Sequence, residues 1–201
     1  MRLVFALVAA IGAGPVVAQD GTAWRDSSEA YWRQVEAEFR DSSTSPLTLA
    51  DRLHFAHLQR FPYDPAYRVE ARFKPARRMD EFDMKTSTTR TPKYRTMGRL
   101  VFRLQGRTFK LPVYQNVELS KRPEYVNYLF LPFTDLTNGQ ETYGGGRYVD
   151  MHGPLGERVT IDLNNAYNPY CAYSDRYSCP IPPAENHLDT EVRAGVKKYH
   201  D

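Results

Sequence analysis

The chain contains little cysteine, carries little net charge and has no long hydrophobic segment. Only two of its 201 residues are cysteine, and 27 basic against 24 acidic side chains leave a net charge of +3. Such a small excess of positive charge does not indicate a nucleic-acid-binding protein. No segment approaches the about 20 apolar residues that a membrane-spanning helix needs. We therefore expect no nucleic acid as a partner and no integral membrane segment in the mature protein.

Recognisable catalytic motifs are also missing. The glycines at 144–146 are followed by Arg147 and not by the Lys-Ser/Thr pair of a P-loop. No nucleophile-elbow motif surrounds a serine. The sequence thus indicates no cofactor and no bound metal, and it leaves open whether the protein is an enzyme.

The first 18 residues have the layout of a secretory signal peptide. Arg2 supplies a positive start, residues 3–11 form a short apolar run, and small residues precede a cleavage position at Ala18. The apolar run is too short to cross a bilayer. We predict cleavage after Ala18 and a mature protein that is periplasmic or secreted.

The two cysteines, Cys171 and Cys179, fit an oxidising compartment. An even number of cysteines in an exported chain predicts a disulfide. A zinc site that also uses Glu185 and His187 is an alternative, although the cysteines lack the short spacing of a zinc knuckle. Two free thiols are the third alternative. We expect the disulfide.

The mature chain is predicted to be helical first and β-rich afterwards. Residues 19–45 form an N-terminal helix and a linker, with Asp26 and Glu29 spaced as in a capping box. Aromatic residues at helical spacing give this helix one apolar face, which we expect to dock on the β-rich part. Thr48 and Asp51 repeat the capping pattern and predict a second short helix. Residues 46–201 form a single β-rich domain.

Alternating apolar and polar residues predict about seven strands after residue 67. They fall at residues 67–73, 79–84, 94–104, 108–117, 125–133, 147–151 and 158–163. A turn at residues 105–107 joins two of them as a hairpin. The predicted fold is mainly β and α+β overall: an antiparallel β-sandwich or small open barrel with two short N-terminal helices.

Two segments of unusual composition hold the candidate ligand-binding residues. If the strands that carry Asp150 and Asp162 are neighbours, carboxylates and amides meet at one end of the sheet, where they suit Ca²⁺ or sugar hydroxyls. Asp and Asn are equally common in turns. The glycines beside Arg147 suit either an anion or a tight turn. The candidates are Tyr143, Arg147, Tyr148, Asp150, Asp162, Asn164, Asn168, Tyr170, Glu185 and Asn186.

These same two segments, LPFTDLTNGQETYGGGRYVD (131–150) and VTIDLNNAYNPYCAYSDRYSCPIPPAEN (159–186), carry a family resemblance. The chain resembles the family called domain of unknown function 1684, found in bacteria and archaea, from Ser45 to Tyr199. Leu163 stands where a Phe is usual, and Val196 where a Glu is usual. The second departure argues against a role for that acid here. The resemblance implies no activity, substrate or cofactor.

The composition of the candidate segments favours a binding function over catalysis. We predict a non-enzymatic ligand-binding or envelope-associated module whose partner is a small molecule or an envelope component. The alternative is a hydrolase or metal-assisted enzyme in which Asp150, Asp162 or Glu185 acts as acid, base or metal ligand.

Overall fold

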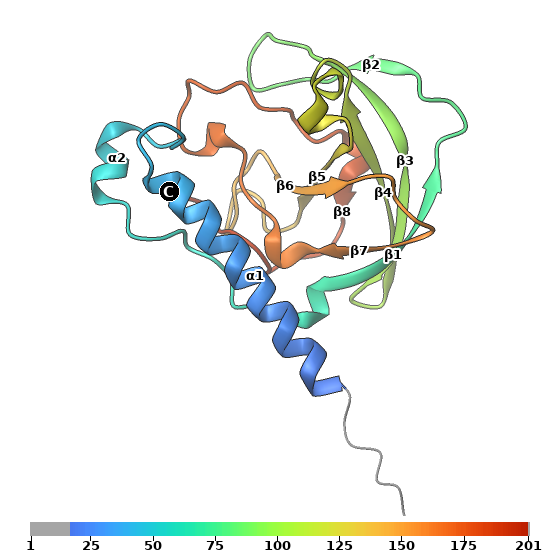
Figure 1. The fold of residues 1–201 in the computed structure, drawn as a ribbon, viewed down its shortest axis with the longest axis horizontal. Coiled ribbons are helices and arrows are strands. Elements are labelled where there is room, and N and C mark those ends of the chain that lie inside the picture. The colour runs from blue at the N-terminus through green and yellow to red at the C-terminus, as the bar shows by residue number, and fades with distance from the viewer. Residues whose placement is uncertain (1–16, 201) are drawn as a thin grey trace, which may run out of the picture.

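The computed structural model describes residues 17–200 (Figure 1). The predicted signal peptide lies almost wholly outside these residues and stays a prediction. Two helices open the described chain as expected, α1 (Val17–Arg40) and α2 (Leu49–His54), but α1, with 24 residues, is long and not short. Helix α1 begins before the predicted start near Asp26, because no proline interrupts residues 17–26. Neither helix of the described chain combines the length and apolar character needed to cross a membrane.

The α2 N-terminus confirms the predicted capping residue. The Thr48 hydroxyl accepts a hydrogen bond from the backbone N–H of Asp51 at 3.1 Å, and it donates one to the Asp51 carboxylate at 2.6 Å. One of the free N–H groups of the first turn, that of Asp51, is therefore satisfied by the cap. It ends at His54, well before the proline at residue 62.

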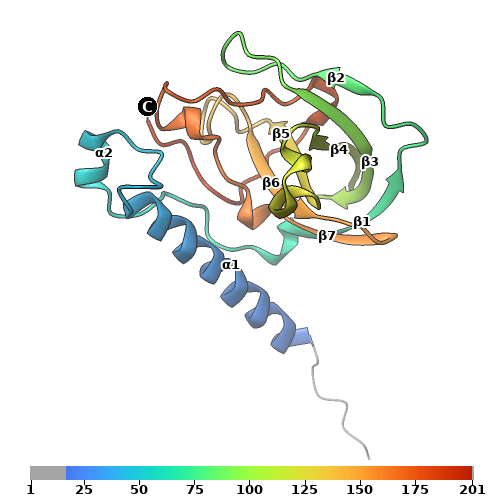
Figure 2. The same cartoon turned by 45° about the horizontal axis from the view of Figure 1, so that its top comes forward.

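Within residues 17–200 the strands form one curled, mostly antiparallel sheet. Its order is β6-β5-β4-β3-β1-β7, with β2 beside β3 and a short parallel strand, β8, beside β5. Figures 1 and 2 show the sheet curving into a half-barrel. The strands are β1 (Arg68–Pro75), β2 (Glu81–Asp83), β3 (Lys93–Leu104), β4 (Arg107–Asn116), β5 (Tyr128–Asp135), β6 (Arg147–His152), β7 (Arg158–Asp162) and β8 (His187–Leu188).

The predicted fold class is confirmed, with the open barrel as the observed form. All seven predicted strands are present, and the eighth, β8, is too short to leave a pattern in the sequence. The β3–β4 hairpin turns at the predicted place. Gln105 and Gly106 both have positive φ, 49° and 78°, as a tight two-residue hairpin turn requires.

Helix α1 packs on the segment that follows β7. The indole N–H of Trp32 donates to the backbone oxygen of Asn164 at 2.9 Å, and the rings of Phe39 and Tyr173 meet edge to face at 4.9 Å. Trp32 and Phe39 are both buried. The expected docking of the aromatic face is therefore confirmed for Trp32 and Phe39, whereas Trp24 is exposed. The segment between residues 163 and 173 forms part of the contact surface, together with Leu47, Leu58 and Val196.

The two edges of the sheet are connected by the same segment. Strand β7 lies at one edge and β6 at the other. After β7 the chain crosses over, and Tyr167 pairs with Tyr148 of β6 through two backbone hydrogen bonds of 2.9 and 3.0 Å. Residues 163–168 therefore close the open side of the half-barrel.

A buried ion pair fixes the start of β6. The Arg147 guanidinium donates to the Asp135 carboxylate at 2.9 Å, and neither side chain is exposed. Arg147 also donates to the backbone oxygens of Val192, Ala194 and Val196. One side chain thus joins β5 and β6 to the C-terminal segment.

Replacing Arg147 with Met is expected to destabilise the protein by roughly 3–5 kcal/mol, because Asp135 is left buried without a counter-charge. Urea unfolding at pH 7 measures the loss. Adding Asp135→Leu should recover part of the stability, since both charges are then gone. The matched control is Arg158→Met, which breaks an exposed ion pair with Glu70 and should change stability little. Equal effects of the two arginine substitutions would contradict the assigned role.

Candidate functional site

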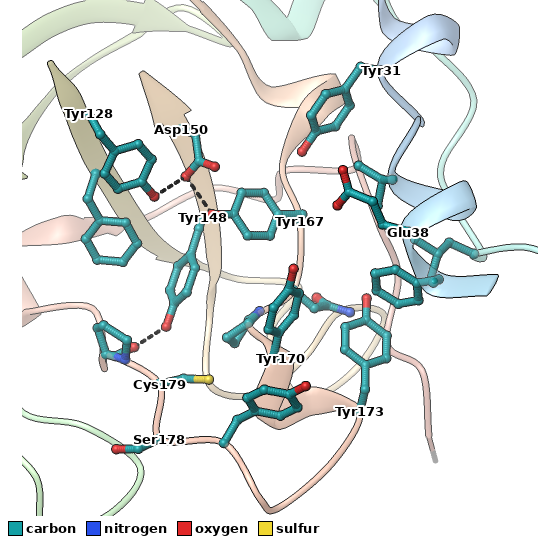
Figure 3. Close-up of a pocket in the computed structure, with 18 of the residues that line it drawn as sticks. Tyr31, Glu38, Tyr128, Tyr148, Asp150, Tyr167, Tyr170, Tyr173, Ser178 and Cys179 are labelled. Atoms are coloured by element: carbon teal, nitrogen blue, oxygen red, sulfur yellow. Dashed lines mark hydrogen bonds between the residues drawn. The ribbon is translucent and has the colours of Figure 1, made fainter. Parts of the chain in front are cut away.

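A cavity of about 500 Å³ between α1, the β5–β6 edge of the sheet and residues 167–180 is the candidate site (Figure 3). Ten of its 21 lining residues are aromatic, and its volume lies within the range usual for small-molecule sites. Eight tyrosines line it: Tyr31, Tyr94, Tyr128, Tyr148, Tyr167, Tyr170, Tyr173 and Tyr177.

Strand periodicity places the sheet side of this wall. Tyr128 and Phe130 lie two residues apart on β5, and Tyr148 and Asp150 lie two apart on β6. Residues two apart point to the same face of a strand. Phe130 pairs with Asp150 across the two strands, so all four side chains line the cavity. The rings of Phe130 and Tyr148 pack edge to face at 4.6 Å.

Asp150 is the polar centre of the cavity. Its Oδ1 accepts hydrogen bonds from the hydroxyls of Tyr128 at 2.6 Å and Tyr167 at 2.5 Å, the contacts dashed in Figure 3. Within the described chain, its Oδ2 accepts no hydrogen bond. The side chain is exposed to solvent because it faces the cavity, yet protein surrounds that cavity. Desolvation by this surrounding protein raises the Asp150 pKa, while the two tyrosine hydrogen bonds oppose the rise.

Helix α1 supplies the opposite side of the cavity. Tyr31 and Glu38 both line it, and Figure 3 shows the Tyr31 hydroxyl and the Glu38 carboxylate directed towards the space in front of Tyr167. Burial raises the Tyr31 pKa, and the negative charges of Asp150 and Glu38 raise it further. The two carboxylates therefore act on the same space from opposite walls.

Four of the ten residues predicted from the sequence line this cavity: Tyr148, Asp150, Asn168 and Tyr170. The other six lie elsewhere. Asp150 and Asp162 would have met if their strands were neighbours. They are not neighbours, because β6 and β7 lie at opposite edges of the sheet. Asp162 instead pairs with Arg68 at 2.9 Å and accepts the backbone N–H of Asn164.

Arg147, Asn164 and Asn186 are buried and engaged within the fold. Asn186 donates to the backbone oxygens of Pro112 at 2.9 Å and Pro132 at 2.7 Å, between β4 and β5. These two strands share a single registered pair, so the Asn186 amide joins them where their own ladder is short. Its role in the structure is therefore that of a bridge between strands.

Asn164 and the glycines before Arg147 also have structural roles. The Asn164 amide exchanges two hydrogen bonds with the backbone of Asp64, at 3.0 and 2.9 Å. Gly146 has a φ of 86°, and a Cβ there would lie 2.6 Å from the backbone oxygen of Phe133. The glycines before Arg147 thus form the tight turn that was the alternative to an anion site.

Glu185 and Tyr143 complete the set. Glu185 forms an exposed ion pair with Arg99 at 2.8 Å and accepts the Tyr114 hydroxyl at 3.2 Å. The Tyr143 hydroxyl lies 3.7 Å from the sulfur of Cys171. Neither of the two lines the cavity.

Cys171 and Cys179 are neighbours but carry free thiols in the structure. The backbone N–H of Cys171 donates to the Cys179 sulfur at 3.1 Å. A hydrogen bond from the Cys179 thiol, followed in size by one from the Tyr143 hydroxyl, lowers the Cys171 pKa to about 6. Since the thiolate is the reactive form, this pair is suited to oxidation. The predicted disulfide is not formed here and stays a prediction.

Within residues 17–200, no three or more His, Cys, Asp or Glu side chains cluster as a metal site would require. The zinc alternative for Cys171, Cys179, Glu185 and His187 therefore has no geometric support in the described chain. His187 instead lies 3.0 Å from the Thr134 hydroxyl through its Nδ1.

Sequence reasoning missed most of the cavity wall. Tyr128 was assigned only to a strand, and Tyr31 only to a docking helix face. Tyr94, Tyr167, Tyr173, Tyr177 and Glu38 were not singled out. The high tyrosine content, 14 residues, was the available signal, because tyrosine suits surfaces with one apolar and one wet side.

The raised Asp150 pKa predicts a pH-dependent effect of Asp150→Asn on stability. A carboxyl whose pKa is raised in the folded state contributes stability below its unfolded pKa and loses it as the pH rises through the folded value. The free energy of unfolding of Asp150→Asn, minus that of the native protein, should therefore be larger at pH 7 than at pH 4. Urea unfolding of both proteins at the two pH values measures the difference. A difference that stays constant or moves the opposite way would contradict the shift.

Comparison with known proteins agrees with the resemblance seen in the sequence. Residues 53–197 match the family described as Protein of unknown function (DUF1684). No curated protein matches the chain. The solution NMR structure of an uncharacterized protein from Haloarcula marismortui is 35% identical, with a TM-score of 0.69, over 89% of this chain and 96% of that one. The chain therefore belongs to the DUF1684 family.

Proposed function

We propose that the protein binds a small organic molecule in the tyrosine-lined cavity. The observation that carries this proposal is the cavity itself: about 500 Å³ with a largely aromatic wall and one carboxylate, Asp150, held in place by two tyrosine hydroxyls. Sites for small molecules are concave, mostly apolar and furnished with a few oriented polar groups. This cavity has each of those properties.

The tyrosines make the wall well suited to recognition. Each supplies a large rigid surface with few rotatable bonds, and each carries a hydroxyl at its far end. Mutual contacts hold several rings in place, such as Tyr148 against Tyr167 at 5.8 Å and Tyr170 against Tyr177 at 5.2 Å. A ligand would therefore meet a largely preformed surface, which lowers the entropic cost of binding.

The enzyme alternative has less support. Of its three acids, Asp150 lines the cavity, whereas Asp162 and Glu185 are paired with Arg68 and Arg99 outside it. Two carboxylates that divide acid and base roles must both reach the substrate. The three acids predicted from the sequence are thus dispersed, and the carboxylates that share the cavity are instead those of Asp150 and Glu38.

A ligand-detected NMR screen tests the proposal. The panel contains organic cations, mono- and disaccharides, and anionic metabolites. We expect one class to bind, and Gln34→Trp to abolish that binding, because Gln34 lines the cavity and a large side chain there would fill it. The matched control is Arg33→Trp, which places the same side chain on the same helix at an exposed position outside the cavity wall.

Native binding should persist in the Arg33→Trp control. Absence of any binding, or binding that survives Gln34→Trp as well as it survives Arg33→Trp, would refute the cavity as the functional site. Circular dichroism of both variants confirms that the fold is unchanged.

We further propose that the protein is exported, as a periplasmic or secreted module, and that Cys171 and Cys179 form a disulfide after export. The signal-peptide layout of residues 1–18 supports the first part. The proximity of the two sulfurs and the low pKa of Cys171 support the second.

The intact mass of protein exported by its own leader tests both parts. We expect the denatured mass to lack residues 1–18 and to be lower by two further hydrogens, which reduction restores. A full-length mass would contradict export. A processed mass with both thiols free, confirmed by alkylation without prior reduction, would contradict the disulfide alone.

A further inference from the structure

We infer that the ligand of the tyrosine-lined cavity is an organic cation: a protonated amine or a quaternary ammonium that carries apolar groups. This inference rests on the proposed binding function and names the chemical class that the cavity would recognise. It follows from three features, which are the charge of the wall, the unshared oxygen of Asp150 and the arrangement of the aromatic rings.

The charge of the wall is negative in a chain whose net charge is positive. Two acidic residues, Asp150 and Glu38, line the cavity, whereas no Lys, Arg or His of the described chain does so. The whole protein has 27 basic against 24 acidic residues. An anion entering this space would meet two carboxylates and no described counter-charge, so anionic ligands are disfavoured.

Asp150 also forms no ion pair within the described protein, although the charge of His152 lowers its pKa somewhat. Its Oδ1 is held by Tyr128 and Tyr167, which leaves Oδ2 without a hydrogen bond from the described chain. The other carboxylate that lines the cavity, that of Glu38, is held less firmly. Within the described chain it accepts one long hydrogen bond, of 3.4 Å, from Gln34. A cation in the cavity would balance both charges, whereas a neutral sugar would leave them unbalanced.

The rings complete a site of the kind that binds ammonium groups. Cations bind over the faces of aromatic rings, and cages of such rings recognise quaternary ammonium ligands. In Figure 3, the rings of Tyr31 and Tyr167 lie beside the space between the Asp150 and Glu38 carboxylates, and Tyr170 lies below it. The protein uses the same attraction at the far end of the wall.

At that far end the guanidinium of Arg176 lies 4.9 Å from the centre of the Tyr177 ring. Arg176 is held there by a hydrogen bond of 2.7 Å to the backbone oxygen of Ser45. Because Arg176 already occupies the face of Tyr177, the ligand cation would lie among the other rings, nearer to the carboxylates of Asp150 and Glu38.

Binding of a cation should depend on pH through Asp150. Only the ionised carboxylate attracts the ligand, so affinity should fall as the pH drops through the Asp150 pKa. Burial raises that pKa above the ordinary value for an aspartate. Other titratable groups face or influence Asp150 or the same space. They are Tyr94 on β3, Tyr128 on β5, Tyr148 and His152 on β6, Tyr31 and Glu38 on α1, and Tyr167, Tyr170, Tyr173, Tyr177 and Cys179 beyond β7.

Calorimetric titration with cations and a neutral isostere tests the inference. The probes are tetramethylammonium, choline and benzyltrimethylammonium, and 3,3-dimethylbutan-1-ol replaces the nitrogen of choline with carbon. We expect choline to bind at least about tenfold more tightly than its isostere. Only the charged nitrogen of choline gains cation–π attraction, and it does so from more than one ring. Asp150→Asn should weaken the cations about tenfold or more, leave the isostere unchanged and reduce the pH dependence to what the remaining Glu38 carboxylate gives.

Two further variants test whether the loss of affinity comes from the charges in the cavity or from the charge of the protein in general. Glu38→Gln alters an exposed helix residue and should weaken the cations in the same direction by a smaller factor. Asp26→Asn removes the same charge from an exposed position of α1 outside the cavity, and affinity should stay unchanged. If Asp26→Asn lowers affinity as much as Glu38→Gln, the attraction is a general charge effect and the inference is wrong.

The outcomes separate this inference from the proposed function. Gln34→Trp-sensitive binding of sugars or anions, without binding of the cations, would overturn the cationic ligand and keep the binding site. Equal affinity for choline and its isostere would do the same. No Gln34→Trp-sensitive binding of any probe would overturn both.

Discussion

The ion pair between Arg147 and Asp135 joins β5 and β6 to the C-terminal segment in the interior of the protein. Both charged side chains are buried, and burying either of them without the other would cost much of the folding free energy. The carboxylate also accepts hydrogen bonds from Thr137 and from the backbone N–H of Val192, so nearly every donor and acceptor of the pair is used. Because Arg147 is the first residue of β6, this arrangement fixes the strand that carries Tyr148 and Asp150 into the cavity wall.

A second constraint follows from the curvature of the sheet. A half-barrel has two free edges, and free edges must be covered or paired. Here the segment after β7 pairs with β6 through Tyr148 and Tyr167, which closes one side and brings the Tyr167 hydroxyl to Asp150. Helix α1 then packs on that segment through Trp32. The candidate site is thus assembled by the same contacts that close the fold.

The elements of this fold could be predicted from the sequence, whereas the site could be predicted only in part. Alternation marks each strand locally, and the Thr48 cap marks a helix start, so both were found. Which strands become neighbours depends on pairings far apart in the chain, and for that reason Asp150 and Asp162 were expected together although opposite edges hold them. Polar residues such as Arg147 and Asn186 look alike in a sequence whether they bind a ligand or the protein's own backbone.

Asp150 differs from the other acidic groups of the interior in what its surroundings supply. Asp135 has an arginine, and Asp162 has Arg68, each at 2.9 Å. Asp150 has two tyrosine hydroxyls on one oxygen, and desolvation raises its pKa. Groups perturbed in this way concentrate at functional sites. On the proposed function, a cationic ligand would supply the counter-charge that Asp135 and Asp162 receive from arginines of the chain.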